Sequence, residues 1–180
     1  MKITDLLKKE TIVLHLSSSN KQEVIEELVN KLDTAGRLSD REGYKQAIIE
    51  REQQSTTGIG EGIAIPHAKS GAVKEAALCF GRSKDGIDYE SLDGQPAKLF
   101  FMIAAPEGAN DTHLDSLSKL SSMLMYDDFR QALLNAGSAD EVLSIIDAKQ
   151  TELEGEDSAD QPAPDTAEAE AEGYVLAVTA

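Results

Sequence analysis

The sequence has a single cysteine, Cys79, so the chain cannot form an internal disulfide, which agrees with a reducing compartment. It has no apolar run near the roughly 20 residues that span a bilayer. Its first ten residues, MKITDLLKKE, also lack the continuous apolar segment of a secretory signal peptide. These absences predict a soluble, cytoplasmic protein. Because Cys79 lies inside the apolar stretch 76–80, we interpret its thiol as a small core side chain.

Basic residues are scarce and unevenly distributed. The chain has 17 Lys and Arg against 33 Asp and Glu, a net charge of −16. All 17 bases and 24 of the acids lie in residues 1–149, which therefore carry −7, whereas residues 150–180 carry nine acids and no base. Surplus negative charge repels phosphate backbones and anionic lipid headgroups. The composition argues against a protein that binds nucleic acid or a membrane surface.

The change in charge after residue 149 also indicates how the chain is divided into a domain and a tail. At 41% apolar residues, 180 residues can bury the core of one ordinary domain, which we place at 1–149. Residues 150–173 have almost no large apolar side chain and many like charges, so we expect an acidic flexible linker. Residues 174–180, YVLAVTA, form a β-prone run that resembles the cut first strand of a second domain.

Three segments carry the Ser/Thr-x-x-Glu/Gln spacing of a helix start: Ser19 with Gln22, Ser39 with Glu42, and Ser138 with Glu141. We expect the first helix to end near Gly36 and the second near Gln54, and a longer helix to begin near Thr112. Apolar residues at helical spacing should be buried: Val24, Ile25, Leu28, Val29 and Leu32 in the first helix; Tyr44, Ala47 and Ile48 in the second; Leu114, Leu117, Leu120, Leu124 and Phe129 in the long helix; Val142, Leu143, Ile145 and Ile146 in the last.

Strand candidates lie between the helices, at residues 11–16, 62–65, 76–82 and 99–104, with a weaker one at 87–89. The run 99–104, LFFMIA, is apolar without interruption, as expected of a strand covered on both faces. The alternation of helices and strands predicts the α/β class, a three-layer domain whose central mixed or largely parallel sheet is flanked by helices on both faces.

His67 is the first candidate for chemistry, because imidazole is the side chain that changes charge near neutral pH. It follows GIGEGIAIP, in which three glycines let the backbone bend and a proline fixes the approach to the histidine. We expect His67 to be held at a strand end, in the open. From residue types alone, a functional role and a purely architectural one both remain possible.

Two further candidates could contact an anion near His67. His113 should lie in the first turn of the long helix, where free N–H groups bind anions and lower the pKa of a nearby imidazole. Arg51 should lie on the last turns of the second helix. Each residue also has a simpler explanation: His113 is an ordinary side chain at a helix start, and the charge of Arg51 is favourable near the C-terminal end of a helix. We interpret His15, inside the strand candidate 11–16, as a half-exposed strand residue.

The segment 60–68, GEGIAIPHA, resembles the phosphorylation-site signature of the EIIA domains of the fructose–mannitol family in the bacterial sugar phosphotransferase system. The resemblance covers residues 1–148 and includes the arginine 16 residues before His67 and the histidine 46 residues after it. It implies that His67 takes a phosphoryl group from the phosphocarrier HPr and passes it to a cysteine of an EIIB domain, fused here and coupled to a membrane EIIC permease, for uptake of a sugar such as fructose. It also implies that Arg51 and His113 support the phosphoryl group.

Elementary chemistry is compatible with this resemblance. A phosphohistidine adds close to two negative charges to a domain that is already acidic, so cations must stabilise it locally. Arg51 offers a planar fork of donors, the backbone N–H groups of residues 112–114 offer more, and His113 offers a ring N–H. Because these groups supply positioning and charge, we expect no metal and no cofactor.

Two other classes of function compete with the sugar carrier. Nitrogen-related EIIA modules share the histidine and signal by phosphorylation-dependent protein binding, although such a regulator would not need the linker and strand at 150–180. A metal hydrolase could use His67, His113, Asp111 and Asp115, but these residues lack the tight spacing of a usual zinc motif.

Overall fold

A computed structural model describes residues 1–159, with side chains through residue 155. In chain order the elements are α1 Ile3–Leu6, β1 Leu7–Val13, α2 Lys21–Thr34, α3 Arg41–Gln54, β2 Gly58–Gly60, β3 Ile63–Ala64, β4 His67–Ser70, β5 Ala77–Ile87, β6 Ala97–Pro106, α4 Asn110–Leu124, α5 Asp127–Asn135 and α6 Ala139–Ala159. In this part of the chain, no helix has the length and apolar character needed to cross a membrane. The expected linker beyond residue 159 and the strand at 174–180 lie outside the described residues.

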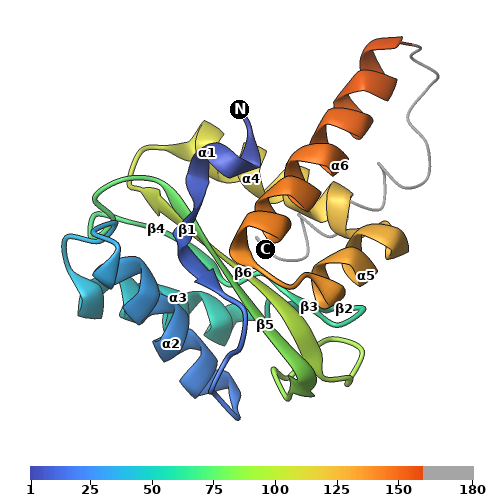
Figure 1. Ribbon diagram of the computed structural model, residues 1–180. Helices are drawn as coiled ribbons and strands as arrows, with labels where there is room; N and C mark the ends of the chain where they lie inside the picture. Colours follow the sequence, from blue (N-terminus) through green and yellow to red (C-terminus); the bar gives the residue numbers. More distant parts are fainter. Residues whose placement is uncertain (160–180) are drawn as a thin grey trace.

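The strands form one mixed sheet in the order β1-β5-β6-β3-β2, with β4 also paired to β6. β6 is parallel to β3 and β4 but antiparallel to β5, and β1 is parallel to β5. Figure 1 shows α2 and α3 on one face of the sheet, with α1, α4, α5 and α6 on the other. The predicted three-layer α/β architecture is therefore confirmed.

The central strand β6 contributes to a core on each face of the sheet. Leu99, Phe101 and Ile103 pack with the helices of one face, whereas Phe100 and Met102 pack with α2 and α3. All five are 0–1% exposed, which confirms a strand covered on both faces. Cys79 in β5 is also fully buried, and burial raises the pKa of its thiol, so it is a core side chain as expected.

Two of the predicted helix caps are shifted by one residue. Asn20 and Asp40, rather than Ser19 and Ser39, accept the free N–H groups of α2 and α3, because an amide or carboxylate oxygen caps a helix as well as a hydroxyl does. The hydroxyl of Ser19 instead donates to the Glu23 carboxylate at 2.9 Å. Ser138 does cap α6, since its hydroxyl accepts the Glu141 N–H at 3.1 Å.

The long helix differs from expectation in three respects. It begins at Asn110, two residues early, and Phe129 belongs to the separate helix α5. Leu114 is 49% exposed, because His113, Leu117 and Leu120 form the buried face and Leu114 lies about 100° away around the helix. Sequence patterning also missed β2 and β4, which are short and exist only through pairing with β3 and β6.

The helical structure continues beyond the predicted domain boundary at 149. Helix α6 continues through Ala159, so residues 150–159 are helical and not part of a flexible linker, and the far end of α6 extends beyond the sheet (Figure 1). Gln150 is 5% exposed. Its side-chain oxygen accepts the buried Ile3 N–H at 2.9 Å, and its amide donates to the Met1 carbonyl at 2.9 Å. Composition could not reveal a glutamine that ties the two ends of the domain together.

Replacing Gln150 with alanine should lower the free energy of unfolding by about 1–3 kcal/mol, since the buried Ile3 N–H would lose its acceptor. Urea denaturation of the wild type and the variant measures the difference. Gln53→Ala is the control, because Gln53 is an exposed glutamine of α3. Equal losses in the two variants would contradict a specific role for Gln150.

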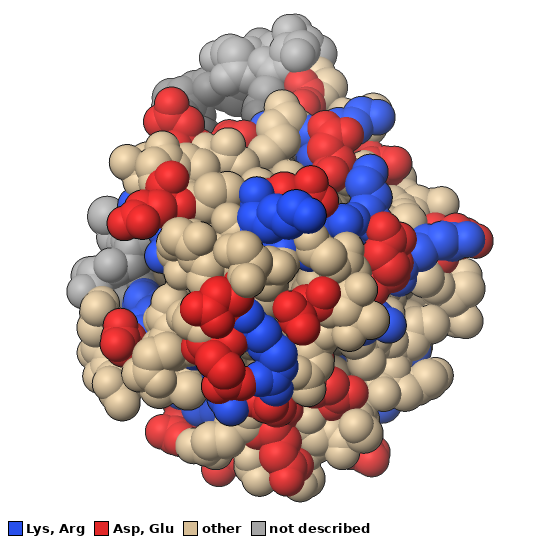
Figure 2. Space-filling view, turned by 90° about the vertical axis from the view of Figure 1, so that its left-hand side faces the viewer, with Lys and Arg blue, Asp and Glu red and all other residues tan. Residues whose placement is uncertain are grey.

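The surface charge is mixed. On the face shown in Figure 2, Lys and Arg side chains are interspersed with Asp and Glu side chains. Most ion pairs of the described residues involve partly exposed side chains, such as Lys9 with Asp140 at 3.1 Å. This face carries no continuous basic tract of the kind that follows a phosphate backbone.

Candidate functional site

His67 is the first residue of β4 and is paired in register with Ile103 of β6. Pro66 directly before it accepts the Ile103 N–H through its carbonyl at 2.9 Å, so the proline takes part in the sheet without needing an N–H of its own. The expectation of an open histidine is wrong, because the residue is only 3% exposed. The His113 ring lies beside it, with the two ring centroids 5.3 Å apart.

The backbone sets the tautomer of His67. Its Nδ1 lies 2.8 Å from the Ile65 carbonyl oxygen, which can only accept a hydrogen bond, so Nδ1 carries the proton. Burial lowers the pKa of the imidazole to about 3, with further lowering by the positive charges of His113 and Arg51, while the Ile65 carbonyl opposes the shift. The ring is therefore neutral at pH 7, and its Nε2, which has no partner among the described residues, keeps a free lone pair.

The glycines before His67 form the turn that presents this segment. Gly60, Glu61 and Gly62 all have positive φ, at 104°, 57° and 77°, and close the turn between β2 and β3. Glycine adopts this conformation at little steric cost. The Asp93 carboxylate accepts the Glu61 N–H at 3.1 Å and so stabilises the turn at its least favourable residue.

Arg51 lies in the last turn of α3, as predicted. One terminal nitrogen, Nη1, donates to the Ser55 carbonyl at 2.9 Å, whereas Nε and Nη2 have no hydrogen-bond partner among the described residues. Burial lowers the pKa of the guanidinium from its usual high value. An arginine with two unsatisfied donors on one edge can bind two oxygens of an anion.

His113 lies in the first turn of α4 and is 5% exposed. Burial, and then the positive charge of Lys69, lowers the pKa of its imidazole to about 4. The lowered pKa matches the expectation for a helix start, but desolvation is the main cause. Because α4 begins at Asn110, the backbone N–H of His113 already donates to the Ala109 carbonyl at 3.1 Å. This N–H, which we expected to contact an anion, is thus used inside the helix.

These side chains line one pocket of about 350 Å³, formed by Ala47, Glu50, Arg51, Gln54, His67, Ala68, Lys69, His113 and Leu114. Arg51, His67 and His113, predicted from distant parts of the sequence, are therefore brought together. His15 is not part of the pocket and is exposed two residues after the end of β1.

Sequence reasoning missed Lys69 as a member of this pocket. It follows His67 by two residues in β4, so the period-two alternation of a strand places both side chains on one face. Its ammonium group donates to the Asn110 side chain at the start of α4. Recognising β4 as a strand would have revealed this second cationic side chain of the pocket, beside Arg51.

The pocket contains a neutral nucleophilic nitrogen surrounded by donors and positive charge, an arrangement that suits transfer of an anionic group. In residues 1–159, no group of three or more His, Cys, Asp and Glu side chains is arranged to hold a metal ion. The hydrolase alternative, with His67, His113, Asp111 and Asp115 as ligands, therefore gains no support from the geometry.

Acidification should destabilise the protein through His67. In the unfolded chain its imidazole takes up a proton below pH 6.5, whereas in the folded chain the pKa of about 3 keeps it neutral, so stability falls as the pH decreases. Between pH 7 and pH 5 the wild type should lose about 2 kcal/mol more unfolding free energy than His67→Gln does. Urea denaturation at both pH values measures this, with His15→Gln as the exposed-histidine control. Equal losses in wild type and His67→Gln would show that His67 is not held neutral.

Comparison with known families gives a match over nearly all of the described domain. Residues 5–149 match the family model described as "Phosphoenolpyruvate-dependent sugar phosphotransferase system, EIIA 2". The chain is 62% identical over 146 residues to the PTS system fructose-specific EIIABC component of Bacillus subtilis, a match that covers 81% of this chain and 23% of that relative. It is 42% identical over 144 residues to the PTS system fructose-specific EIIA component of Haloferax volcanii, covering 80% of this chain and 94% of that relative.

Solved structures share the fold. The nitrogen regulatory protein IIA-Ntr of Neisseria meningitidis aligns with a TM-score of 0.71 and 31% identity over 80% of this chain and 98% of its own. Enzyme IIA mannitol of Escherichia coli, in its complex with phosphorylated enzyme IIB mannitol, aligns with a TM-score of 0.69 and 26% identity over 79% of this chain and 99% of its own.

Proposed function

The chain belongs to the EIIA 2 family of the phosphoenolpyruvate-dependent sugar phosphotransferase system, and we propose that His67 carries its phosphoryl group. EIIA domains are the phosphotransferase components of enzyme II in that system. In this proposal His67 Nε2 receives the phosphoryl group from phosphorylated HPr and delivers it to a cysteine of an EIIB domain, for uptake of fructose.

The observation that carries the proposal is the state of the His67 ring. Nδ1 donates its proton to the Ile65 carbonyl, so the lone pair is on Nε2, which has no partner among the described residues. The pKa of about 3 keeps that lone pair available over the whole physiological range. A nucleophile that needs no prior deprotonation requires no general base.

In the first transfer, the Nε2 lone pair attacks the phosphorus of the HPr phosphohistidine. A new N–P bond forms, the N–P bond to HPr breaks, and its electron pair returns to the HPr imidazole. In the second transfer, a thiolate of EIIB attacks the same phosphorus, and the electron pair of the N–P bond returns to His67. Arg51, with its two free donors, His113 and Lys69 stabilise the charge of the phosphoryl group in both steps.

The fructose assignment rests on two relatives named as fructose-specific, at 62% and 42% identity. The chain spans 23% of the length of the first, an EIIABC protein. We propose that this domain acts at the cytoplasmic face of a permease complex, with an EIIB domain as the acceptor and a membrane EIIC domain acting indirectly.

A second function is a regulatory module of the nitrogen type. The structural likeness to IIA-Ntr of Neisseria meningitidis favours it, because the two share the fold at 31% identity. Such a module would accept the phosphoryl group but use it to change which proteins it binds.

One assay separates these functions. The chain is incubated with labelled phosphoenolpyruvate, enzyme I and HPr, and a purified fructose-type EIIB domain is then added. We expect label on His67 that passes to the EIIB cysteine. Label that stays on the chain in the presence of EIIB would favour the regulatory module, and a chain that takes up no label would contradict the proposed function.

A further inference from the structure

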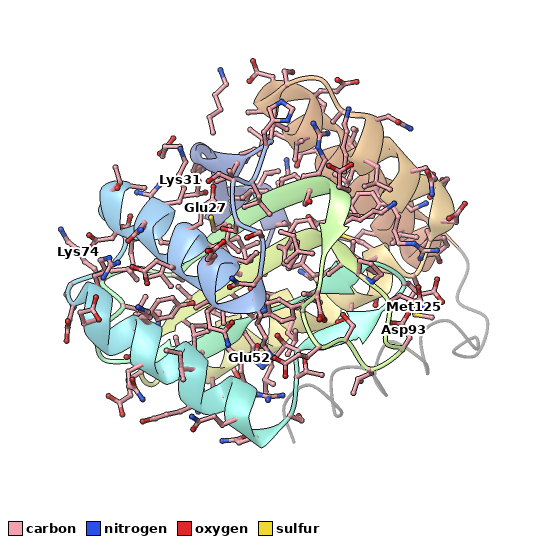
Figure 3. All side chains as sticks on the ribbon, turned by 90° about the horizontal axis from the view of Figure 1, so that it is seen from below. Glu27, Lys31, Glu52, Lys74, Asp93 and Met125 are labelled. Carbon is pink, nitrogen blue, oxygen red and sulfur yellow. The ribbon has the colours of Figure 1, made fainter. Side chains whose placement is uncertain are left out.

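Next to Arg51 lies a buried carboxylate, that of Glu52, to which the steps above assign no role. Its side chain is 6% exposed and lies on the inner side of α3, facing α2 and the sheet (Figure 3). It accepts from the Lys21 ammonium at 2.9 Å, the Thr57 N–H at 3.0 Å, the Tyr89 hydroxyl at 3.1 Å and the Thr57 hydroxyl. These four residues, Lys21, Glu52, Thr57 and Tyr89, are called the Glu52 network below.

The Glu52 network fixes the segment that holds Arg51. Because the Glu52 carboxylate binds both the N–H and the hydroxyl of Thr57, the chain from residue 55 to residue 57 is pinned against the end of α3. Within that segment, the Ser55 carbonyl accepts from Arg51 Nη1 at 2.9 Å. One donor of the guanidinium is thereby anchored, and Nε and Nη2 stay free for the pocket.

The same segment is bonded to the backbone that orients His67. The Thr57 carbonyl accepts the Ile65 N–H at 3.0 Å, and the Ile65 carbonyl accepts from His67 Nδ1 at 2.8 Å. Thr57 therefore connects the Glu52 carboxylate to Ile65, the residue whose carbonyl sets the His67 tautomer. Two short hydrogen-bonded paths leave Glu52, one to Arg51 and one to His67.

Stability alone gives a poor account of such a network. Removing a carboxylate and an ammonium from water is costly, and a buried ion pair is often no more stabilising than well-packed apolar side chains of the same volume. A saturated polar network does, however, define one geometry for the segments that it joins. Lys21, Thr57 and Tyr89 come from three different parts of the chain, at the start of α2, after α3 and after β5.

We propose that Glu52 is a positioning residue for phosphoryl transfer, which holds Arg51 and the His67 ring in the relative arrangement that the reaction needs. The inference rests on the proposed function of His67. Glu52 does not contact the phosphoryl group, since its oxygens are occupied by the network.

The test compares Glu52→Ala and Glu52→Gln with the wild type in transfer from phosphorylated HPr. We expect Glu52→Ala to lower kcat by about 10-fold to 100-fold, because a displacement of about 1 Å at a reacting group can cost about 100-fold. KM for phosphorylated HPr should stay within about twofold, because Glu52 is only 6% exposed and its removal changes little of the surface that HPr would meet. Glu52→Gln should recover most of kcat, since its amide oxygen can still accept the Thr57 N–H.

A spectroscopic measurement distinguishes positioning from loss of stability. In the wild type, ¹⁵N shifts of the His67 ring should report a protonated Nδ1 and a bare Nε2, and in Glu52→Ala they should move toward a mixture of tautomers. Ile48→Val, which shortens a buried side chain one turn earlier in α3, is the matched control for stability and should retain the wild-type ¹⁵N shifts. Wild-type kcat and ¹⁵N shifts in Glu52→Ala would overturn the inference, as would an equal loss of kcat in Ile48→Val.

The experiment also covers a Glu52→Ala variant that does not fold and a wild type that is not phosphorylated. If Glu52→Ala does not fold, Tyr89→Phe removes one donor to the carboxylate and keeps the ring, and it should change kcat and the ¹⁵N shifts in the same direction by less. Unchanged values in Tyr89→Phe would then overturn the inference. If the wild type takes up no phosphoryl group, the proposed function fails, whereas the ¹⁵N shifts still test whether Glu52 orients His67.

Discussion

His67→Ala should lose all detectable phosphorylation by phosphorylated HPr while keeping its fold. The variant removes the buried, neutral nitrogen whose lone pair is free in the pocket, and with it the atom that forms the N–P bond. In the wild type the product should be labile in acid and stable in base, as expected for phosphohistidine. Gel-shift or mass measurement of the intact protein, before and after acid treatment, gives the result.

A competing nucleophile in the pocket is His113, whose ring centroid lies 5.3 Å from that of His67. His113 should not replace it, because its role in the proposed mechanism is to stabilise a phosphoryl group that is already attached to the other ring. His15→Ala is the control and should be phosphorylated normally, since His15 is exposed and outside the pocket. Label mapped to His113 or His15, or label retained in His67→Ala, would contradict the assignment.

Arg51→Ala should slow transfer from phosphorylated HPr by roughly 10-fold to 150-fold. A hydrogen bond to a charged group contributes about 1.5–3 kcal/mol, and each 1.36 kcal/mol corresponds to about tenfold in rate. Two donors of Arg51 are free to make such bonds. Arg51→Lys should be intermediate, because lysine keeps the charge but cannot present two parallel donors. Rapid-quench measurement of single-turnover transfer gives the rates.

His113→Ala should slow transfer by a similar factor. Because both residues contact the same phosphoryl group in the proposed mechanism, the double variant should lose less than the product of the two single factors. Arg41→Ala, which removes an arginine from the first turn of the same helix as Arg51, should leave the rate unchanged. Wild-type rates in both Arg51→Ala and His113→Ala would reduce these residues to ordinary helix-end side chains.

Local signals in the sequence were sufficient for the fold class and for choosing His67 as the first candidate residue. The unbroken apolar run of β6 predicted a strand buried on both faces, and helical spacing predicted the buried faces of α2 and α3, because burial against a sheet requires these patterns. The glycines and the proline that precede His67 are also a local signal, because they lie within nine residues of it in the sequence. Arg51 and His113 became candidates through the spacing of a family motif, and the fold does bring them into one pocket with His67.

Burial and hydrogen bonding at the site were decided only by the tertiary structure, because they depend on segments that are distant in the sequence. His67 is 3% exposed and lies beside His113, 46 residues later, so the expectation of an open histidine failed. The exposure of Leu114 depends on which side of α4 meets the sheet. Gln150 extends the domain because it meets the N-terminus. In the sequence, Glu52 is one of 33 acidic residues and has no distinguishing feature. In the structure it is distinguished by the hydrogen-bond donors of Lys21, Thr57 and Tyr89. A carboxylate is stable in a buried position only where the fold supplies such partners.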